Sequence, residues 1–277
     1  MGPVPGRVPL AIAAIIGFAV LAPSAGAATT VGQSPPSGGT PLACSFTAPG
    51  AINDFTQIGS VTGPAYTVPP GGGVITSWRT AITSGLAAMS LRLFTGNVAA
   101  VQATAEARLE SIVPGGQTVF PTRISAAGGE FLGYSYSSPA GAGGCVNEGA
   151  APGDLIGGSV SKPVGEGEAV IATGAGQLLN ISASLEPDAD KDGFGDETQD
   201  AEITKGPKQK TSSPNATFRF TGSASVECRL DKKKFKVCSS PKKFKKLDSG
   251  RHTFRVHALT LTSEVSPDDK FVWRIEG

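Results

Sequence analysis

Short stretches of alternating apolar and polar residues run through the chain from residue 44 onward. In the stretch SLRLFTGN, Leu91 and Leu93 point to one side of an extended chain and Arg92 and Phe94 to the other, which is the period-two pattern of a half-buried strand. Similar stretches recur between Gly, Pro and Asn residues at a spacing typical of β-sandwiches. The pattern therefore predicts an N-terminal, jelly-roll-like β-sandwich over residues 44–185.

A second series of alternating stretches fills residues 201–277. Five strong strand patterns and two weaker ones, at residues 201–207 and 242–247, predict a small seven-stranded sandwich. Trp78 in the first sandwich and Trp273 in the second also lie in alternating stretches and are expected in the cores. The residues expected to line the second core are Phe218, Phe220, Val226, Cys228, Leu230, Phe254, Val256 and Ala258. The whole chain is thus predicted to be all-β.

The N-terminus has the features of an export signal. Arg7 is followed by an uncharged apolar run over residues 8–21 and then by the small-residue triplet ending at Ala27, which has the A-x-A form of a cleavage site. An uncleaved membrane anchor is the alternative, but the run is shorter than the roughly 20 apolar residues that a membrane span needs. We therefore predict a signal peptide over residues 1–27, no stable membrane span after cleavage and a secreted protein. Residues 28–43 lack periodicity and predict a flexible linker.

Composition and charge narrow the class of protein. Gly 37 and Pro 21 in 277 residues, with 39% hydrophobic residues, are typical of turn-dense β proteins and disfavour helical bundles and disorder. The net charge of +1 divides into −8 for residues 1–200 and +9 for residues 201–277. The chain therefore consists of two modules with opposite charge.

Four cysteines in an exported protein predict two disulfides, for which three pairings exist. Proximity in sequence favours Cys228 with Cys238, which leaves Cys44 with Cys145. A zinc site is the rival interpretation. It is disfavoured because the chain has no C-x-x-C spacing and its two histidines lie close in sequence to neither cysteine of the 228/238 pair.

An acidic connector over residues 186–200 carries the most specific motif. The expected ligands, at the spacing of a calcium-binding loop, are Asp188, Asp190, Asp192, the backbone carbonyl of Phe194, and Asp196. Gly193 allows the sharp turn, whereas Gln199 stands where a bidentate Glu would complete an EF-hand, and Asp200 is a substitute one residue later. The motif resembles a single thrombospondin type 3 calcium repeat, so the expected cofactor is Ca²⁺. The alternative is a solvated linker held by Asx turns.

The second module contains the patterns A-x-F-x-F, E-C-R-L-D, C-x-S-P and L-x-x-G-x-H-x-F-x-V. These resemble the immunoglobulin-like or fibronectin-III-like modules of secreted, multi-module actinobacterial surface proteins. The resemblance implies that the two cysteines of the module, Cys228 and Cys238, fasten one hairpin. The many lysines around these cysteines depart from the pattern of the family.

The lysines of the second module form a candidate binding patch: Lys232, Lys233, Lys234, Lys236, Lys242, Lys243, Lys245 and Lys246. Phe235 and Phe244 are expected to point into the core, which leaves the ammonium groups outside. Such a patch attracts anionic cell-wall polymers or anionic glycans by counterion release. The alternative is that the lysines only keep an edge strand soluble. Nucleic acid is not an expected partner of an exported protein.

The sequence contains no G-x-S-x-G, H-E-x-x-H or Walker motif, so no enzyme activity is expected. The preferred function is a monomeric, noncatalytic extracellular or cell-envelope binding protein with a calcium-stiffened linker. One alternative is a carbohydrate-binding sandwich in which Tyr134 and Tyr136 stack a sugar, although such a pair more often packs in a core. A glycan-acting hydrolase or lyase would need Glu166 and Glu168, or another acidic pair, to converge in a pocket.

Overall fold

The computed structural model of the 277-residue chain describes residues 27–35, 40–43, 52–116, 119–138, 141–148, 150–222 and 225–277. These residues form strands, turns and bends and contain no helix, which confirms the all-β prediction. The described residues therefore include no helix that could cross a membrane. Nearly all of the predicted signal peptide, residues 1–26, lies outside the described residues, as does Cys44.

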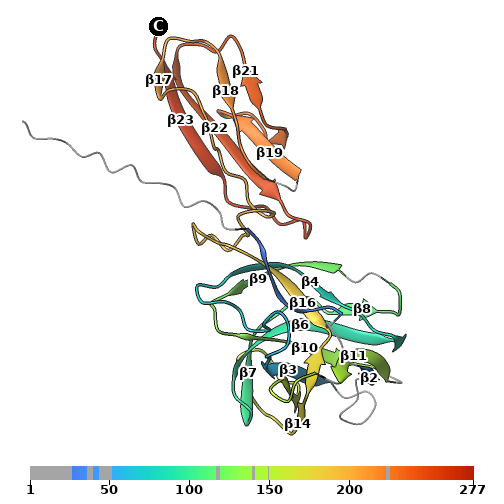
Figure 1. Ribbon diagram of the computed structural model, residues 1–277. Coiled ribbons are helices and arrows are strands. Elements are labelled where there is room, and N and C mark those ends of the chain that lie inside the picture. Colours follow the sequence, from blue (N-terminus) through green and yellow to red (C-terminus); the bar gives the residue numbers. More distant parts are fainter. Residues whose placement is uncertain are drawn as a thin grey trace, which may run out of the picture.

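Three antiparallel sheets build the first module (Figure 1). The largest contains, in spatial order, β13 (Gly167–Ala169), β7 (Ala100–Glu106), β6 (Ala87–Gly96), β10 (Phe131–Ser137), β3 (Asn53–Gly59), β12 (Leu155–Val160) and β14 (Ala172–Ala175), with β8 (Glu110–Ile112) beside β6. The second sheet contains β1 (Thr29–Gln33), β16 (Ile181–Glu186), β4 (Gly73–Thr80) and β9 (Val119–Ala126). The third contains β15 (Gln177–Leu179), β11 (Ala142–Glu148) and β2 (Thr40–Ala43), with β5 (Ser84–Gly85) beside β11.

The core of the first module lies between these sheets. Leu91 and Leu93 of β6 are fully buried in it, as the alternation predicts, and Trp78 of β4 is 1% exposed. Its indole ring packs against Phe120 of β9 with ring centroids 4.8 Å apart. Because the same core joins strands of all three sheets, the module has the sandwich architecture that its sequence predicts.

Part of the segment predicted as a flexible linker is a strand. Residues 29–33 form β1, which pairs with β16, and Val31 on β1 is 2% exposed. Gly32 has φ +75°, and a Cβ atom there would lie 2.5 Å from the Ile181 carbonyl oxygen, so the close approach of the two strands requires glycine. Residues 40–43 form β2 as well. The flexible-linker prediction for residues 28–43 is wrong at these positions. Hydrogen bonds between backbones form these strands although few of their side chains are bulky.

The second module contains a five-stranded sheet and a two-stranded sheet with a core of their own (Figure 1). The first has the order β17 (Lys210–Thr211), β23 (Asp269–Ile275), β22 (Gly250–Leu259), β19 (Ser225–Leu230) and β20 (Lys236–Val237), and the second consists of β18 (Ala216–Phe218) and β21 (Lys242–Phe244). Seven strands are therefore present in the described part of the module. The prediction of the first strand at residues 201–207 is wrong, because these residues make only an isolated bridge at Lys205. The first strand is β17, which pairs in parallel with β23.

All of the residues predicted for the second core are buried. Phe218 lies at its centre, stacked on Phe254 at 4.2 Å between ring centroids and in edge contact with Phe244 at 6.2 Å. Trp273 is 1% exposed and also contacts Phe218. Phe235 does not enter this core, contrary to expectation, because its ring stacks on His257 at 4.0 Å on the opposite face of the sheet.

Candidate metal centre at the module junction

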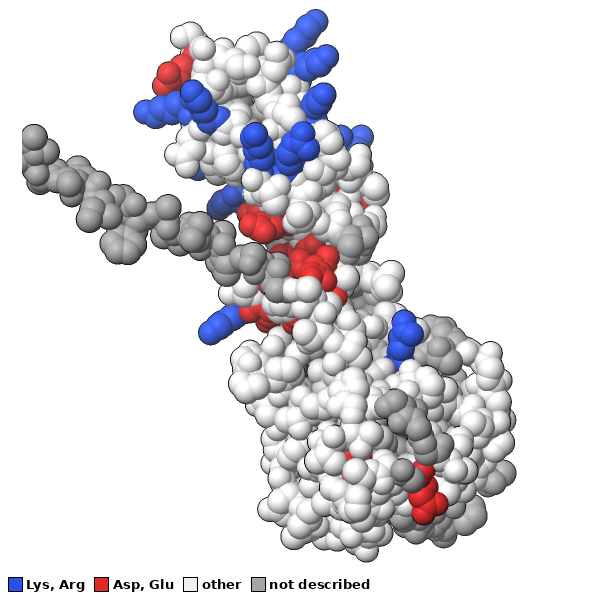
Figure 2. Space-filling view, viewed as in Figure 1, with Lys and Arg blue, Asp and Glu red and all other residues white. Residues whose placement is uncertain are grey.

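The acidic loop, residues 188–200, lies between the two modules. Acidic side chains gather at this junction (Figure 2). Side chains of both the loop and the sandwich fix the loop to the first module. Phe194 is 8% exposed and lies under the Arg123 guanidinium of β9, 4.5 Å from the ring centroid. Glu186 of β16 accepts hydrogen bonds from the backbone amides of Glu197 and Thr198 at 3.1 and 2.8 Å. The loop is therefore attached to the sandwich rather than freely solvated.

The aspartates of the loop accept hydrogen bonds from the backbone amides of the loop itself. The two carboxylate oxygens of Asp188 accept from the amides of Asp192 and Gly193 at 3.0 and 3.2 Å, and Asp192 accepts from the Phe194 amide at 2.8 Å. Gly193 has φ +82°, as a turn this tight requires. The Asp192 bond is an Asx turn, as in the alternative interpretation, whereas the two Asp188 bonds span four and five residues. Together these bonds bring the carboxylates close to one another.

Five carboxylates form two overlapping clusters. One contains Asp188, Asp190 and Asp196, and the other contains Asp190, Asp192 and Asp200; within each cluster one oxygen from every residue lies within 4.8 Å of the others. Asp190 belongs to both. The structure thus brings together all four aspartates predicted from the sequence and adds Asp200.

Gln199 is not part of either cluster. It is 5% exposed, and its side-chain amide donates to the Thr122 carbonyl of β9 at 2.7 Å, while its oxygen faces the Gly195 amide at 3.4 Å. The residue at the twelfth position therefore fastens the loop to the first module. Asp200, one residue later, supplies the carboxylate instead.

Burial and mutual repulsion perturb these carboxyl groups. Burial, reinforced by the carboxylates of Asp200, Asp190 and Asp188, raises the pKa of Asp192 to about 6. Burial, with the carboxylates of Asp190, Asp188 and Asp200 nearby, raises the pKa of Asp196, and burial with those of Asp190 and Asp269 raises the pKa of Asp200. Closely spaced carboxylates repel one another when they are ionised, so their pKa values rise. A bound cation lowers this repulsion.

Contacts from the loop region also reach the second module. Arg123 donates to both carboxylate oxygens of Glu264 at 2.8 and 2.6 Å, and to the Gly193 carbonyl of the loop at 3.2 Å. Arg123 therefore connects the first module, the acidic loop and the β22–β23 connection of the second module. The side chain of Ser266, from the same connection, lowers the pKa of the Asp200 carboxyl against the larger, opposite effect of burial.

The donor set fits a hard cation. All clustered side chains are carboxylates and none is His or Cys, which disfavours zinc and favours Ca²⁺ or Mg²⁺. Each cluster offers at least three carboxylate oxygens, and Asp190 joins the two clusters. The acidic loop can therefore hold a metal ion.

The disulfide prediction is confirmed for the second module, where Cys228 and Cys238 are bonded with their Cα atoms 6.0 Å apart. Cys145 of β11 is fully buried and takes part in a disulfide. The bond predicted between Cys145 and Cys44 involves a residue outside the described ranges.

The eight lysines of the candidate patch lie on the turn after β19, on β20 and β21, and on the segment that follows β21; seven are exposed and Lys242 is half-buried. Figure 2 shows basic side chains projecting from several sides of the second module. Among the ion pairs formed by described residues, none uses a lysine; the cations are all arginine or histidine.

Tyr134 and Tyr136 do not form a sugar-stacking platform. They are 0% and 4% exposed, and their rings pack on Phe55 in the first core. The Tyr134 hydroxyl donates to the Cys145 carbonyl at 3.1 Å, and the Tyr136 hydroxyl accepts from the Ala142 amide at 3.0 Å. The carbohydrate-binding alternative based on this pair is therefore wrong, because the alternation that selects the two rings places them on the inner face of the sheet.

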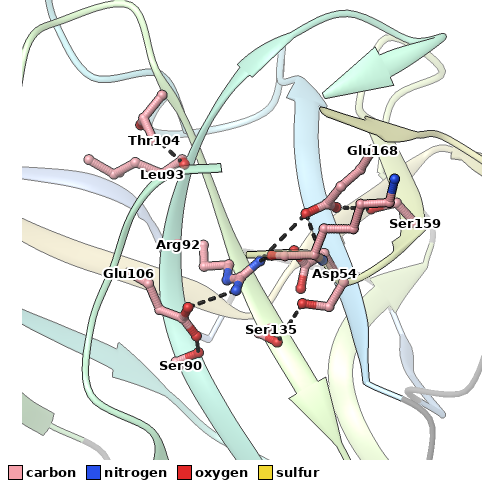
Figure 3. A network of polar contacts seen from close by, with 11 residues as sticks. Asp54, Ser90, Arg92, Leu93, Thr104, Glu106, Ser135, Ser159 and Glu168 are labelled. Atoms are coloured by element: carbon pink, nitrogen blue, oxygen red, sulfur yellow. Dashed lines mark hydrogen bonds and ion pairs between the residues drawn. The ribbon is translucent and has the colours of Figure 1, made fainter. Parts of the chain in front are cut away.

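Glu166 and Glu168 do not act as a pair either. Glu166 is exposed, whereas the Glu168 side chain is fully buried and accepts from the Ser159 hydroxyl at 2.6 Å. Glu168 lies instead near Arg92, which contacts Asp54 at 2.6 Å, Glu106 at 2.7 Å and Glu168 at 3.5 Å (Figure 3). With side-chain exposures of 0%, Asp54 and Glu168 offer no surface to a substrate.

This buried network was missed by sequence reasoning. Arg92 and Asp54 lie on the face of the large sheet opposite the main core, and the segment that leads into β13 covers them: its Lys162 carbonyl accepts from Arg92 at 2.8 Å. Burial, together with the nearby Glu168 carboxylate, raises the pKa of Asp54 to about 7. Three carboxyl groups therefore share one guanidinium: Asp54 and Glu168 are shielded from solvent, whereas the Glu106 side chain is 30% exposed. The network holds the covering segment on the sheet.

Comparisons with known proteins add little to this description. No protein-family model and no curated protein matches the chain. Among solved structures, similarity is found to the extracellular domain of a protein described as a hybrid two-component system from B. thetaiotaomicron, with 13% identity and a TM-score of 0.26 over 68% of this chain and 26% of that one. A second is the glycoside hydrolase domain of Endo-D from Streptococcus pneumoniae, with 10% identity and a TM-score of 0.20 over 89% of this chain and 37% of that one. The chain thus spans well under half of either structure, and at these TM-scores the likenesses carry no argument about fold or function.

Proposed function

We propose that the chain is a noncatalytic extracellular binding protein in which Ca²⁺, held by the acidic loop, fixes the orientation of two β modules. The observation that carries this proposal is the position of the carboxylate clusters. They lie in the loop that Gln199 and Phe194 hold on the first module, and whose Gly193 carbonyl accepts from Arg123, which is paired with Glu264 of the second module. An ion at this point contacts the junction itself.

The proposed ion is held by Asp188, Asp190, Asp192, Asp196 and Asp200 with the Phe194 carbonyl. Calcium neutralises carboxylates that otherwise repel one another, so binding stabilises the compact form of the loop. Because the Phe194 ring lies under Arg123, and Arg123 is paired with Glu264 of the second module, ordering of the loop also supports the contact between modules. Calcium thereby acts as a structural clamp.

Two features support export. The Cys228–Cys238 disulfide is of a kind that persists in oxidising, extracellular compartments. The amide nitrogen of Ala28 lies 3.1 Å from a carboxylate oxygen of Glu197 in the acidic loop. Cleavage after Ala27 converts this amide into an α-ammonium group beside a carboxylate, which adds an ion pair to the junction.

A noncatalytic role is supported by the burial of the acidic groups that converge in the first module. Asp54 and Glu168 hold a covering segment in place through Arg92 and are not open to solvent. The second module resembles the small modules of secreted multi-module proteins, which agrees with a role in binding.

Calorimetric titration of the mature protein with CaCl₂ tests the metal site. The parent protein is expected to bind Ca²⁺, and Asp190→Asn is expected to weaken binding at least about tenfold, because Asp190 belongs to both clusters and affinity follows ligand charge. Glu166→Gln removes one exposed carboxylate that belongs to neither cluster and serves as the matched control, with unchanged affinity. Absence of binding by the parent protein at millimolar Ca²⁺, or equal affinity in the two variants, contradicts the proposal.

A further inference from the structure

A groove of about 520 Å³ opens at one edge of the second module. It lies where the turn after β19 and strand β20 face β21 of the other sheet, so it marks the open side of this small sandwich. Its rim carries Lys232, Lys233, Lys234, Lys236 and Lys242. The lysines that looked like a continuous surface patch in the sequence thus divide into five that line a cavity and three, at 243, 245 and 246, that do not.

The floor of the groove is apolar and rigid. Leu230 is 4% exposed, and the half-buried ring of Phe244 packs against Phe218 and Phe254 of the core. The disulfide from Cys228 to Cys238 fastens β19 to the chain that follows β20. A ligand in the groove therefore meets a fixed hydrophobic surface below and mobile ammonium groups around it.

The positive charge of the rim has no acidic partner within the described protein. Asp231, at the start of the turn, has φ +54° and directs its carboxylate to His252 at 2.9 Å and to the Thr253 amide at 2.8 Å. Arg229 also lines the groove, but its guanidinium stacks on Phe235 at 4.6 Å and lies 3.7 Å from Asp268. The charge offered to a ligand is therefore that of the lysines.

These features determine the chemistry of the occupant. Lysine ammonium groups are separate point charges without the bidentate geometry of arginine, so they respond to several anionic groups spaced along a ligand rather than to one. The apolar floor suits the C–H face of a sugar ring, as aromatic and aliphatic surfaces in ligand pockets do. We infer that this groove binds a segment of an acidic polysaccharide, with sugar rings over the half-buried Phe244 ring and acid groups against the lysines.

The inference rests on the proposed role as a binding protein and names what is bound. It does not depend on the metal, because the groove lies wholly within the second module. Binding to the polysaccharide is therefore expected to persist in chelator. Failure of polysaccharide binding leaves the calcium titration as an independent measurement on the same preparation.

The test compares two variants of the mature protein with equal charge loss. Lys232→Gln, Lys234→Gln and Lys236→Gln together remove three charges from the rim, and Lys243→Gln, Lys245→Gln and Lys246→Gln remove three charges outside it. With polygalacturonate as the probe, the rim variant is expected to lose at least about tenfold in affinity and the control variant no more than about threefold. The parent affinity is expected to fall at least about tenfold between about 50 and 500 mM NaCl, since exposed charges are screened within about 8 Å at physiological ionic strength.

Neutral dextran and vesicles that contain phosphatidylserine complete the experiment. Neither is expected to compete for the groove, because dextran lacks acid groups and a membrane surface cannot enter between the two sheets. Equal losses in the two triple variants, no affinity for polygalacturonate, equal binding of dextran, or binding to vesicles alone would each overturn the inference. Unchanged thermal unfolding of both variants establishes that the comparison is made between folded proteins.

Discussion

Replacing Arg92 by methionine is expected to destabilise the first module by about 3–5 kcal/mol at pH 8, the usual cost of removing one partner from a buried ion pair. The guanidinium has 6% side-chain exposure and contacts Asp54 and Glu168, whose side chains are fully buried. Without the arginine these carboxylates keep no cationic partner within the network. Thermal unfolding followed by calorimetry should show the loss in the transition of the first module alone.

The loss is expected to depend on pH with a defined sign. The pKa of Asp54 is already raised to about 7 in the folded protein, so the folded state holds this proton at pH values where the unfolded chain releases it. Such a group contributes stability at low pH that is lost as the pH rises through the folded pKa. Removing Arg92 raises this pKa further, and the variant should therefore be closer to the parent in stability at pH 5 than at pH 8.

Two variants make the Arg92 prediction specific. Arg79→Met removes an exposed arginine from β4 and is expected to change stability by less than about 0.5 kcal/mol. Addition of Asp54→Asn and Glu168→Gln to Arg92→Met neutralises the buried carboxylates and is expected to recover part of the loss at pH 8. A destabilisation of Arg92→Met that is equal at pH 5 and pH 8, with no recovery in the triple variant, would show that packing rather than charge explains it.

Replacing Phe218 by alanine is expected to destabilise the second module by about 3–5 kcal/mol. Phe218 is fully buried, and its ring contacts Phe254, Phe244 and Trp273, so the substitution leaves a cavity at the centre of the core. Because Phe244 forms part of the groove floor, polysaccharide affinity should fall as well.

Phe235→Ala provides the same chemical change outside this core. Its ring is half-buried over His257 and Arg229 on the outer face of the sheet, and its removal is expected to cost about 1 kcal/mol. Calorimetry of the two variants measures both effects. Equal destabilisation by Phe218→Ala and Phe235→Ala would contradict the assignment of the second core.

The strands of the second module and the carboxylate loop could be predicted because their signals are local. Alternation alone assigns Phe218 and Phe254 to the inner face, and the spacing of Asp188, Asp190 and Asp192 follows from the turn that a calcium loop makes. Both depend on residues within about a dozen positions of one another. The structure places them as the sequence indicates.

The features that the sequence did not predict depend on segments distant in the chain. Alternation places Arg92 on the second face of its strand but does not reveal that the segment before β13 buries it there. In the same way, Val31 becomes a core residue only because β16, more than a hundred positions later, pairs with β1. The sequence indicates Asp200 as the substitute for Gln199, but it does not show that the Gln199 side chain instead donates to the Thr122 carbonyl of β9, more than seventy positions earlier.

Residual dipolar couplings of backbone amides, recorded for the mature protein with Ca²⁺ and with chelator, test the central claim most directly. If calcium in the acidic loop fixes the modules, the couplings of residues 52–116 and of residues 225–277 fit one common alignment tensor in Ca²⁺. In chelator, and for Asp190→Asn in Ca²⁺, the two modules should require different tensors. A common tensor in both conditions, or separate tensors in both, would contradict the proposal that the ion determines how the two modules are oriented.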